Sequence, residues 1–420
     1  MRCILVFVLM LVPYLVFAQQ GAGPDMPIIL EHADSIVGAG QFESSSRTFY
    51  GNVRFQQGNV TGRCDRAIHN AAANSVELFG NVVVRQGRLT MYAPEVRYSG
   101  ANYVATATKG IRVEQNGQTI EARRGVYSTN THIAQFFEDV FMYDDSMRMW
   151  SDTMIVDRDD DTMRATGRVV GYDSSDRVWF ESDLAQRDAR TGSYALTNNA
   201  RLWQWGNSGD TMFVSADTLD SRREPNGSAR ILDARGSAVL IKGPTCARSG
   251  RITYQERQAL LQLDNEPYVW TDSMAFVAKA ITASILEKRI ESMTGAGQAL
   301  LMSRVHNAIP ARYDQIAGSV INLSFAQDTL RTILAAGDAQ SITYRSDSTK
   351  QEGLAKVASD SLRAVFENGQ LSDVYWLGGI AGEHHPERLV LGKETEFLLP
   401  RFSWRTDRPQ MAQPNTKKLR

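Results

Sequence analysis

The feature that most constrains the fold of this chain is an internal repeat of about thirty residues. A small residue, often followed by Asp, recurs every 29 to 34 residues between Ala33 and Ala278, and at wider spacing beyond. Ser151-Asp152 is a typical instance. Eleven such positions occur along the 420 residues. A repeat of this length indicates an array of similar supersecondary units, each of which buries its apolar face against the next.

The residues between these positions alternate between apolar and polar side chains, which is the pattern of half-buried β-strands. The segment from Gly80 to Val84 shows the second half of a unit, in which a Gly-Asn pair precedes an alternating strand. The alternation changes parity at such pairs, and an odd step turns side chains to the other face unless the strand bends or carries a bulge. The sequence therefore predicts an all-β fold, an elongated repeat β-jellyroll or solenoid of about ten to eleven two-strand units, whose strands bend between two facing sheets.

The first 18 residues have the layout of a secretory signal peptide. A basic start at Arg2 precedes an apolar core from Ile4 to Phe17, and Ala18 ends the segment before a polar break. An uncleaved membrane anchor is the alternative, but this core is shorter than the roughly 20 residues that span a bilayer. We expect cleavage after Ala18, a repeat β-jellyroll over residues 28–344, divergent repeats or a cap over 345–407, and a disordered tail over 408–420.

The composition argues against several classes of protein. The chain carries 46 Lys and Arg against 47 Asp and Glu, and this even balance is not that of a nucleic-acid-binding protein. Its three Cys provide neither a disulfide framework nor a Cys/His metal-ligand spacing. Beyond the leader, Cys64 and Cys246 remain. An export compartment would permit a disulfide between them, but their separation in a repeat array favours two buried free thiols.

Several polar clusters resemble catalytic or metal sites but have simpler explanations. The acidic run from Asp157 to Asp161 lacks the Gly and the distant Glu of a calcium loop, and it lies where the repeat needs a hairpin tip. His384-His385 has no third ligand at suitable spacing and indicates a surface loop. The recurrent Asp is explained by local hydrogen bonding at a bend. Because the sequence contains no catalytic or cofactor-binding motif, we expect no enzyme, no cofactor and no metal site.

The repeat resembles the OstA-like (organic solvent tolerance-like) N-terminal domain family of lipopolysaccharide-transport proteins of the LptA, LptC and LptD type. The resemblance rests on the small-Asp-x-apolar element, as in Ser151-Asp152-Thr153-Met154. It rests equally on the Gly-Asn-Val corner with its alternating strand, as at Gly51 to Phe55. It is clearest from about Ile28 to Trp205 and continues more weakly beyond.

The resemblance implies a periplasmic protein that binds lipopolysaccharide and carries it toward the outer membrane. The acyl chains of lipid A would lie in a groove between the sheets. Exposed end strands would pair with LptC-like and LptD-like jellyrolls, or with a second copy of the chain. By their place after a corner, the residues expected to line the groove are Val53, Phe55, Val82, Val84, Ile111, Val113, Val140, Met142 and Val169.

Two alternatives stay open on the sequence alone. An exported structural or adhesive β-solenoid would have a packed interior and would bind no lipid. A β-helical carbohydrate-active enzyme would gather acidic residues on one exposed face, whereas here Asp occurs about once per unit at a bend. Alternation of apolar residues does not separate an open groove from a packed core.

Overall fold

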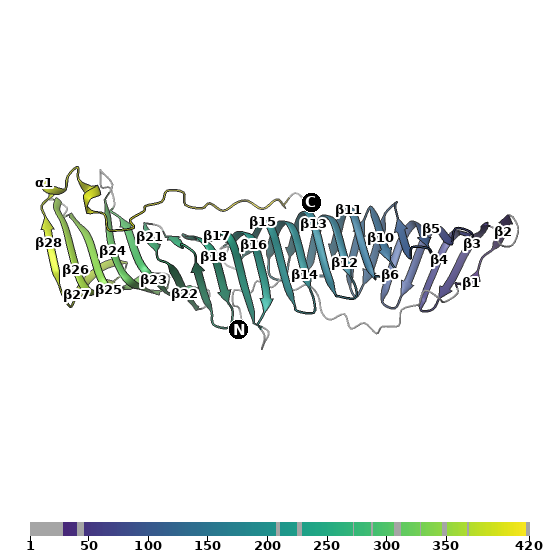
Figure 1. The fold of residues 1–420 in the computed structure, drawn as a ribbon, viewed down its shortest axis with the longest axis horizontal. Coiled ribbons are helices and arrows are strands. Elements are labelled where there is room, and N and C mark those ends of the chain that lie inside the picture. The colour runs from purple at the N-terminus through teal and green to yellow at the C-terminus, as the bar shows by residue number, and fades with distance from the viewer. Residues whose placement is uncertain are drawn as a thin grey trace. The chain divides into compact units, whose positions relative to one another are not determined.

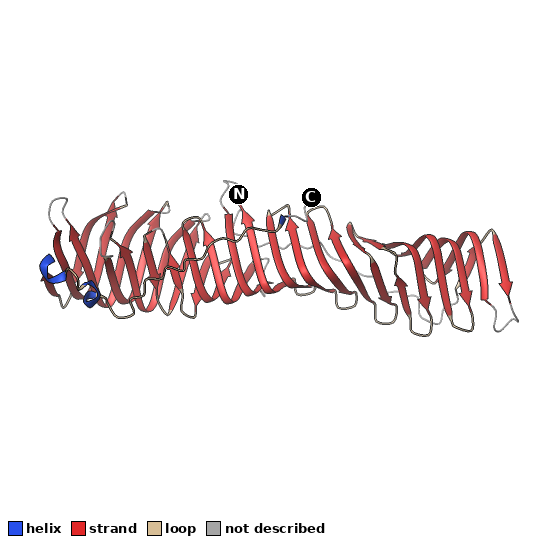
Figure 2. Cartoon of the chain, turned by 90° about the horizontal axis from the view of Figure 1, so that it is seen from above, coloured by secondary structure: helices blue, strands red, loops and turns tan. Residues whose placement is uncertain are grey.

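A computed structural model of the chain describes residues 28–39, 46–206, 211–224, 229–271, 273–286, 289–305, 312–327, 329–346, 351–367 and 369–416. Within these ranges the chain consists of antiparallel β-strands and two short helices (Figures 1 and 2). The all-β prediction is therefore confirmed. The predicted signal peptide lies outside the described residues. Neither of the described helices is long and apolar enough to span a membrane.

The chain divides into two compact units, with residues 8–198 in the first and residues 199–420 in the second. The strands of the first unit are β1 (Ile29–His32), β2 (Ser35–Ala39), β3 (Ser46–Gln57), β4 (Val60–Asn70), β5 (Ser75–Gln86), β6 (Leu89–Ser99), β7 (Val104–Ala107), β8 (Ile111–Gln115), β9 (Gln118–Ala122), β10 (Arg124–Ser128), β11 (Ile133–Tyr143), β12 (Met147–Asp157), β13 (Thr162–Asp173) and β14 (Val178–Asp188). Strand β15 (Ser193–Trp205) contains the residues at which one unit ends and the next begins.

The second unit continues the same pattern and ends in two helical turns. Its elements are β16 (Thr211–Arg223), β17 (Arg230–Lys242), β18 (Thr245–Gln255), β19 (Leu260–Asp264), β20 (Tyr268–Trp270), β21 (Met274–Val277), β22 (Ala280–Leu286), β23 (Arg289–Arg304), β24 (Tyr313–Ala326), β25 (Thr329–Ser346), β26 (Gln351–Glu367), β27 (Gln370–Leu377), β28 (Ala381–His385), helix α1 (Glu387–Val390) and the 3-10 helix η1 (Glu394–Phe397).

Strands bend at corners that are made by two successive residues with a left-handed backbone. At Gly80 and Asn81, φ is 72° and 44°, a conformation that Gly adopts freely and Asn tolerates better than most residues. The two residues oppose a single residue, Pro94, on the neighbouring strand. The corner is therefore a β-bulge, which confirms the change of parity predicted from the sequence.

The recurrent Asp stabilises the corner of the adjacent strand. Asp65 lies against Gly80, where a Cβ atom would clash with its carboxylate, and it accepts a hydrogen bond of 2.9 Å from Asn81 Nδ2. Asp152 accepts a bond of 2.6 Å from Arg168 Nη2 at an equivalent corner. The structure thus confirms that the repeated Asp makes local hydrogen bonds at a bend.

The two polar clusters considered as metal sites have different outcomes. The run from Asp157 to Asp161 forms the predicted hairpin tip, where Asp157 Oδ1 accepts 3.0 Å bonds from the backbone N–H groups of Asp159 and Asp160. The prediction of a surface loop at His384-His385 is wrong. Both residues lie in β28, because this segment pairs with β26 instead of leaving the sheet.

In the first unit, the corners divide the strands between two packed layers. Layer A contains segments 53–57, 60–64, 82–86, 89–93, 111–115, 118–122, 140–143, 147–151, 169–173 and 178–182, and layer B contains the segments on the other side of each corner. One core cluster draws on both layers. Its fully buried members are Val53, Cys64, Val82 and Ala93 from layer A and Ala67, Leu78, Val96 and Ala107 from layer B.

The second unit repeats this two-layer arrangement. Its layer A includes segments 213–215, 238–242, 245–249, 268–270, 274–277, 299–304 and 313–317. Because successive side chains of a strand point to opposite faces, Val269 faces the interior while Tyr268 and Trp270 face outward. The outward positions in register with Trp270 form what we call the second outer row: Phe213, Ile241, Cys246, Trp270, Ala275, Met302, Gln315 and Ile342.

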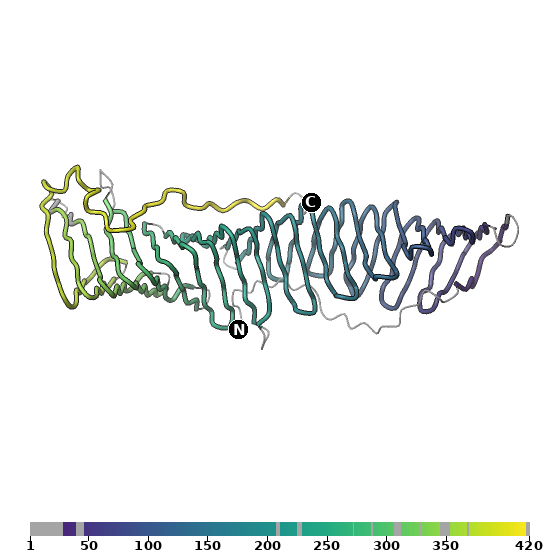
Figure 3. Tube along the Cα trace, in the orientation of Figure 1, coloured from purple at the N-terminus to yellow at the C-terminus, as the bar shows by residue number. Residues whose placement is uncertain are grey.

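An extended segment covers the second outer row. Residues 398–416, here called the strap, run without strand pairing across layer A of this unit (Figure 2; yellow trace in Figure 3). Trp203 Nε1 donates a hydrogen bond of 2.7 Å to the backbone oxygen of Ala412, and Arg408 Nε lies 3.2 Å from Cys246 Sγ. Arg408 and Ala412 belong to the stretch for which the sequence predicts disorder. Their contacts give that stretch an attachment which the sequence did not reveal.

Candidate functional site

The nine residues predicted to line a groove all lie on the inner face of layer A in the first unit. Four of them are half-buried: Phe55, Val84, Ile111 and Val113. The other five are almost fully buried, with exposed fractions of 2% or less: Val53, Val82, Val140, Met142 and Val169. The side chains therefore face one common interior.

These residues form two parallel rows. The row next to the corners contains Val53, Val82, Ile111, Val140 and Val169, on every second strand of the layer. The strands between them contribute small residues at the same level: Cys64, Ala93, Ala122, Ser151 and Ser182. Large and small side chains thus alternate along the interior, which lets the facing layer approach between the larger ones.

The sequence reasoning missed a cluster of methionines in the same interior. Met147, Met149, Met154 and Met163 are buried, with exposed fractions of 7% or less, and they join Met142 within strands β11 to β13. Met154 and Met163 come from layer B, whose inner face the prediction did not include. The alternation on the other side of each corner would have identified them. Unbranched thioether side chains make this part of the interior the most adaptable.

At the hairpin-tip edge of the first unit, one arginine links the two layers. Arg158, in the tip between β12 and β13, donates from Nη1 to Gln86 Oε1 in layer A at 3.3 Å. The same nitrogen donates to the hydroxyl of Tyr127 in layer B at 3.0 Å. The link joins residues 72 apart in sequence. Polar contacts thus bridge the edge at which the two layers end, opposite the corners.

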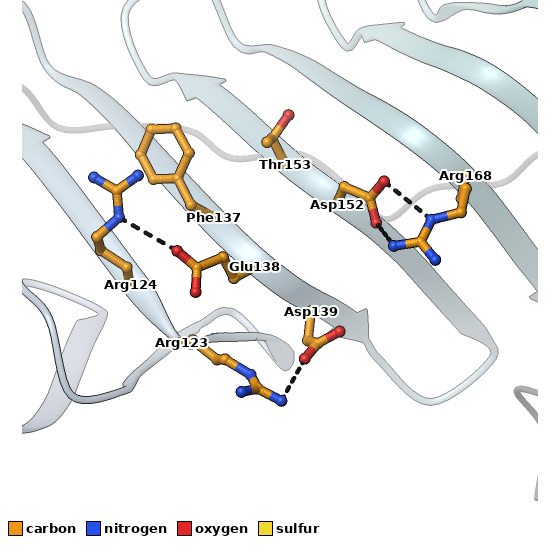
Figure 4. A pocket seen from close by; sticks show the side chains of 8 residues that line it. All are labelled: Arg123, Arg124, Phe137, Glu138, Asp139, Asp152, Thr153 and Arg168. Atoms are coloured by element: carbon orange, nitrogen blue, oxygen red, sulfur yellow. Dashed lines mark hydrogen bonds and ion pairs between the residues drawn. The ribbon is translucent and has the colours of Figure 1, made fainter.

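The outer surface carries a separate depression along the corners. It encloses about 510 Å³, and the side chains that line it are drawn in Figure 4. Its lining is formed by corner residues and by outward-facing residues of layer B: Arg123, Arg124, Phe137, Glu138, Asp139, Asp152, Thr153 and Arg168.

All three guanidinium groups in this depression are already paired with carboxylates. Asp152 raises the pKa of Arg168 through its hydrogen bonds, and the Arg124 guanidinium lies 4.1 Å from the centroid of the Phe137 ring. An added anion would therefore compete with existing partners, and the depression is a weak candidate for an anion site. The ion pairs are Arg123 with Asp139 at 2.7 Å, Arg124 with Glu138 at 3.9 Å and Arg168 with Asp152 at 2.6 Å.

Neither metal-binding nor thiol chemistry has a site within the described ranges. These ranges contain no group of three or more His, Cys, Asp or Glu side chains placed to hold a metal ion. Cys64 and Cys246 are both buried free thiols. Burial raises the pKa of Cys64 to about 11, which keeps that thiol protonated and unreactive.

Comparison with known proteins gives a family match in the first unit. Residues 25–152 match the model of the family described as OstA-like protein. A search of curated proteins found no match to this chain. Among solved structures, the chain is similar to LptH from Pseudomonas aeruginosa, described as the LptA homologous periplasmic component of the conserved lipopolysaccharide transport device. That similarity has 19% identity and a TM-score of 0.24, and it covers 27% of this chain and 83% of LptH. Residues 25–152, which carry eight of the nine predicted groove residues, are thus similar in sequence to the OstA-like family.

Proposed function

We propose that this protein is a periplasmic lipopolysaccharide-binding transport bridge, which holds acyl chains between layers A and B of the first unit and delivers the glycolipid toward the outer membrane. The proposal is supported by the OstA-like match over the strands that carry the interior rows. It assigns the chain no catalytic step and no cofactor. The nine residues of the two interior rows are the proposed acyl-chain contacts.

The methionine cluster of β11 to β13 is the observation that carries this proposal. A rigid, branched core loses packing energy when a guest enters, because its side chains have few alternative rotamers. Met has three flexible side-chain torsions and a polarizable sulfur, so the buried Met142, Met149 and Met154 can reorient around an alkyl chain. The half-buried Phe55, Val84 and Val113 form the interior row farther from the corners, and this row would be the entry side for the acyl chains.

Exposed strand edges provide the proposed sites for partners. In the first unit, β1 and β2 pair only with β3 among the described strands, and Leu30 and Val37 are exposed on them. In the second unit, β27 and β28 pair only with β26 within the described part, and Tyr375 is exposed there. Unpaired backbone groups at such edges can extend a sheet into another molecule. We propose LptC-like and LptD-like jellyrolls, or a second copy of this chain, as the partners.

A second candidate function is an exported structural scaffold that binds no lipid. It is favoured by the near-complete burial of the row next to the corners, where Val53, Val140 and Val169 are 2% exposed or less. A tightly packed interior would make the chain rigid but would leave no room for an acyl chain. The two functions differ in whether the layers separate to admit a guest.

Site-specific photo-crosslinking tests the proposal. A photoreactive residue at Val113 faces the interior, whereas the same residue at Arg112 faces outward on the same strand and serves as the matched control. With the chain expressed in its native envelope, we expect crosslinks to a lipid A species from position 113 and none from position 112. Mass spectrometry of lipids that copurify with the chain provides an independent readout.

The opposite result would replace the transport function with the scaffold. If position 113 gives no lipid adduct and the purified chain carries no glycolipid, the interior is packed and the family match describes the fold alone. Equal crosslinking from positions 112 and 113 would indicate nonspecific contact with the membrane and would also contradict binding between the layers.

A further inference from the structure

The strap is bound in the way that proteins bind an extended peptide. Tyr268 Oη donates a hydrogen bond of 2.9 Å to the backbone oxygen of Ser403 and accepts one of 3.1 Å from the backbone N–H of Arg405. Trp270 Nε1 donates to the backbone oxygen of Arg405 at 3.2 Å. Side chains of the sheet thus recognise the main chain of the strap, and no strand ladder joins the two.

The sheet also holds specific side chains of the strap. The guanidinium of Arg405 lies 5.5 Å from the ring centroid of Tyr268 and 5.7 Å from that of Trp270, within reach of a cation–π interaction. Further along, Phe402 and Trp404 both pack against Tyr313, with centroid distances of 5.1 Å and 4.8 Å. An aromatic-x-aromatic-Arg pattern is therefore matched by aromatic residues of β20 and β24.

Charged contacts continue the match. Asp407 pairs with Arg248 of β18 at 2.6 Å and with Arg405 of the strap itself at 2.7 Å. Hydrogen bonds from Arg405 and Arg248 hold the pKa of Asp407 well below its usual range. The next residue, Arg408, contacts Cys246 of β18. Aromatic contacts at β24 and β20 and ionic contacts at β18 thus hold the strap along its path from β24 to β18.

The sheet residues under the strap are more deeply buried than the strap that covers them. The sheet residues are almost completely buried, with exposed fractions of 4% for Tyr268 and Trp270 and 2% for Cys246. The strap is exposed or half-buried along residues 400–416. If the strap left, a broad apolar face with aromatic hydrogen-bond donors would be exposed. Such a face requires a ligand, and the strap shows the chemistry of the ligand that it accepts.

We propose that the second outer row, together with the neighbouring outward side chains Arg248, Tyr268 and Tyr313, is a peptide-binding site. Residues 398–416 occupy it in the same molecule, and the same segment of a second copy of this chain can occupy it in exchange. The second copy is the occupant because its strap would reproduce every contact described above. The site lies on the outer face of the second unit, so the proposal does not depend on lipid binding between the layers of the first.

Cys246 provides a built-in reporter of occupancy. It lies beneath Arg408, and burial raises the pKa of its thiol, so a covered Cys246 reacts slowly with maleimide. Cys64 is buried in the core of the first unit and serves as an internal reference for global unfolding. Labelling of each thiol in the full chain is quantified separately by mass spectrometry of proteolytic peptides.

The test weakens the strap and then replaces it. In the full chain with Trp404→Ala and Arg405→Ala, we expect Cys246 to react at least tenfold faster than in the unaltered chain, with Cys64 unchanged. Adding about 100 µM of a synthetic peptide of residues 398–416 should restore the slow rate, a concentration at which micromolar affinity saturates the site. The same peptide with both substitutions is the matched control and should leave the rate fast.

Three outcomes would overturn the proposal: unchanged labelling of Cys246, fast labelling that the unaltered peptide does not slow, or equal protection by both peptides. If Cys64 also becomes reactive, the variant has unfolded, and a second experiment decides. A peptide of residues 398–416 with benzoylphenylalanine in place of Phe402 is irradiated with the unaltered chain. Crosslinks to residues 313–317 of β24 support exchange, and their absence at saturating peptide excludes it.

Discussion

The outward face of layer A differs between the two units although its register is the same. On strands that leave a corner, the position compared is the third residue after the first inner residue, as Tyr143 follows Val140 and Trp270 follows Pro267. On the strands between them it is the residue paired across, as Cys246 is paired with Trp270. In the second unit all eight members of the second outer row are 8% exposed or less. In the first unit the corresponding positions, here called the first outer row, are Gln56, Thr61, Arg85, Thr90, Glu114, Thr119, Tyr143, Arg148, Tyr172 and Trp179.

From β3 to β12 the first outer row is mostly polar, and apart from Thr119 its members there are exposed or half-buried. The row ends at the half-buried Tyr172 and at Trp179, which is fully buried. One backbone design thus accepts two different outer surfaces. The corners and the interior fix the strands, while the outer face is free to become either a solvated surface or a binding surface. The strap converts a two-layer structure into a three-layer one in the second unit.

The largest expected effect comes from placing a charge on each row. Met302 is fully buried in the second outer row, so Met302→Lys would bury an ammonium group without a partner and cost more than about 4 kcal/mol of unfolding free energy. Thr90→Lys, at the matching half-buried position of the first outer row, should stay within about 0.5 kcal/mol of the unaltered chain. Urea unfolding monitored by hydrogen exchange of each unit measures both. Similar losses at the two positions would remove the distinction between the rows.

Truncation of an aromatic residue gives the next largest difference. Trp270→Ala removes a side chain that is 4% exposed and donates to the strap, and we expect a loss of about 3 kcal/mol in the second unit. Tyr143 at the matching position is half-buried and stacks on Phe141 at 4.9 Å, so Tyr143→Ala should cost about 1 kcal/mol. Exchange rates of amides in β20 and β11 report the two losses separately. A larger loss at Tyr143 would show that the first outer row also supports a covering segment.

A half-buried carboxyl of the second unit, Asp314, can be compared with a surface carboxyl of the first. Burial raises the pKa of Asp314 to about 6, above its ordinary value of 3.8, although the carboxyl accepts a 2.8 Å bond from the backbone N–H of Tyr344. Because the ionised form is disfavoured in the folded state, this group makes the second unit more stable as pH falls from about 6 to 4. Asp314→Asn should remove that rise and stabilise the unit at pH 7.5 by roughly 1–2 kcal/mol.

The measurement is the unfolding free energy as a function of pH for both chains. Glu114→Gln in the first outer row is the control, because Glu114 forms a surface ion pair with Arg112 at 2.5 Å and accepts a long 3.4 Å bond from the Tyr92 hydroxyl, so the change in stability should be less than about 1 kcal/mol. A pH profile of Asp314→Asn that keeps the rise between pH 6 and 4 would assign it to another group.

The smallest effect concerns the charge pairs under the strap. Asp407 has a lowered pKa, so its contribution to strap binding is present at neutral pH and is lost as pH falls below about 4. Asp407→Asn should therefore accelerate thiol labelling of Cys246 by a few-fold at pH 7. Hydrogen exchange of residues 398–416 measures opening of the strap. In the Asp407→Asn variant, this opening should no longer increase as the pH is lowered. Equal acid sensitivity in the variant would mean that these pairs contribute nothing to strap binding.

The corners and the interior could be predicted because short stretches of neighbouring residues determine each of them. Gly80-Asn81 requires a left-handed backbone, Asp65 completes the corner, and alternation then places Val82 and Val84 inward. Because every unit repeats the same corner and the same alternation, the pattern can be recognised even though single units deviate from it. The edge pairing of His384-His385 was missed because no turn chemistry distinguishes a final strand from a loop.

The strap could not be predicted for a physical reason. Its contacts join side chains to backbone atoms, as Trp203 joins Ala412, and such contacts impose no periodicity on the bound segment. Polar residues and Pro within residues 408–420 instead favour disorder when read alone. The apolar second outer row was the available signal. Cys246 and Trp270 are outward positions at which β3 to β12 of the first unit place mostly polar residues, and they mark a face that needs a cover.

The strap also limits how many repeats the second unit can contain. A repeat array ordinarily tolerates gain or loss of a unit, since each unit contacts only its neighbours. Here Leu399 is held by Gln315 of β24 and Arg408 by Cys246 of β18, nine residues that span at most roughly 30 Å. The four strand-to-strand steps between β18 and β24 take up roughly 19 Å, and one more pair of strands would raise this to roughly 29 Å. The strap thus acts as a ruler: one added unit beneath it would stretch residues 399–408 almost to their full length, and a second, at roughly 38 Å, would require a longer strap.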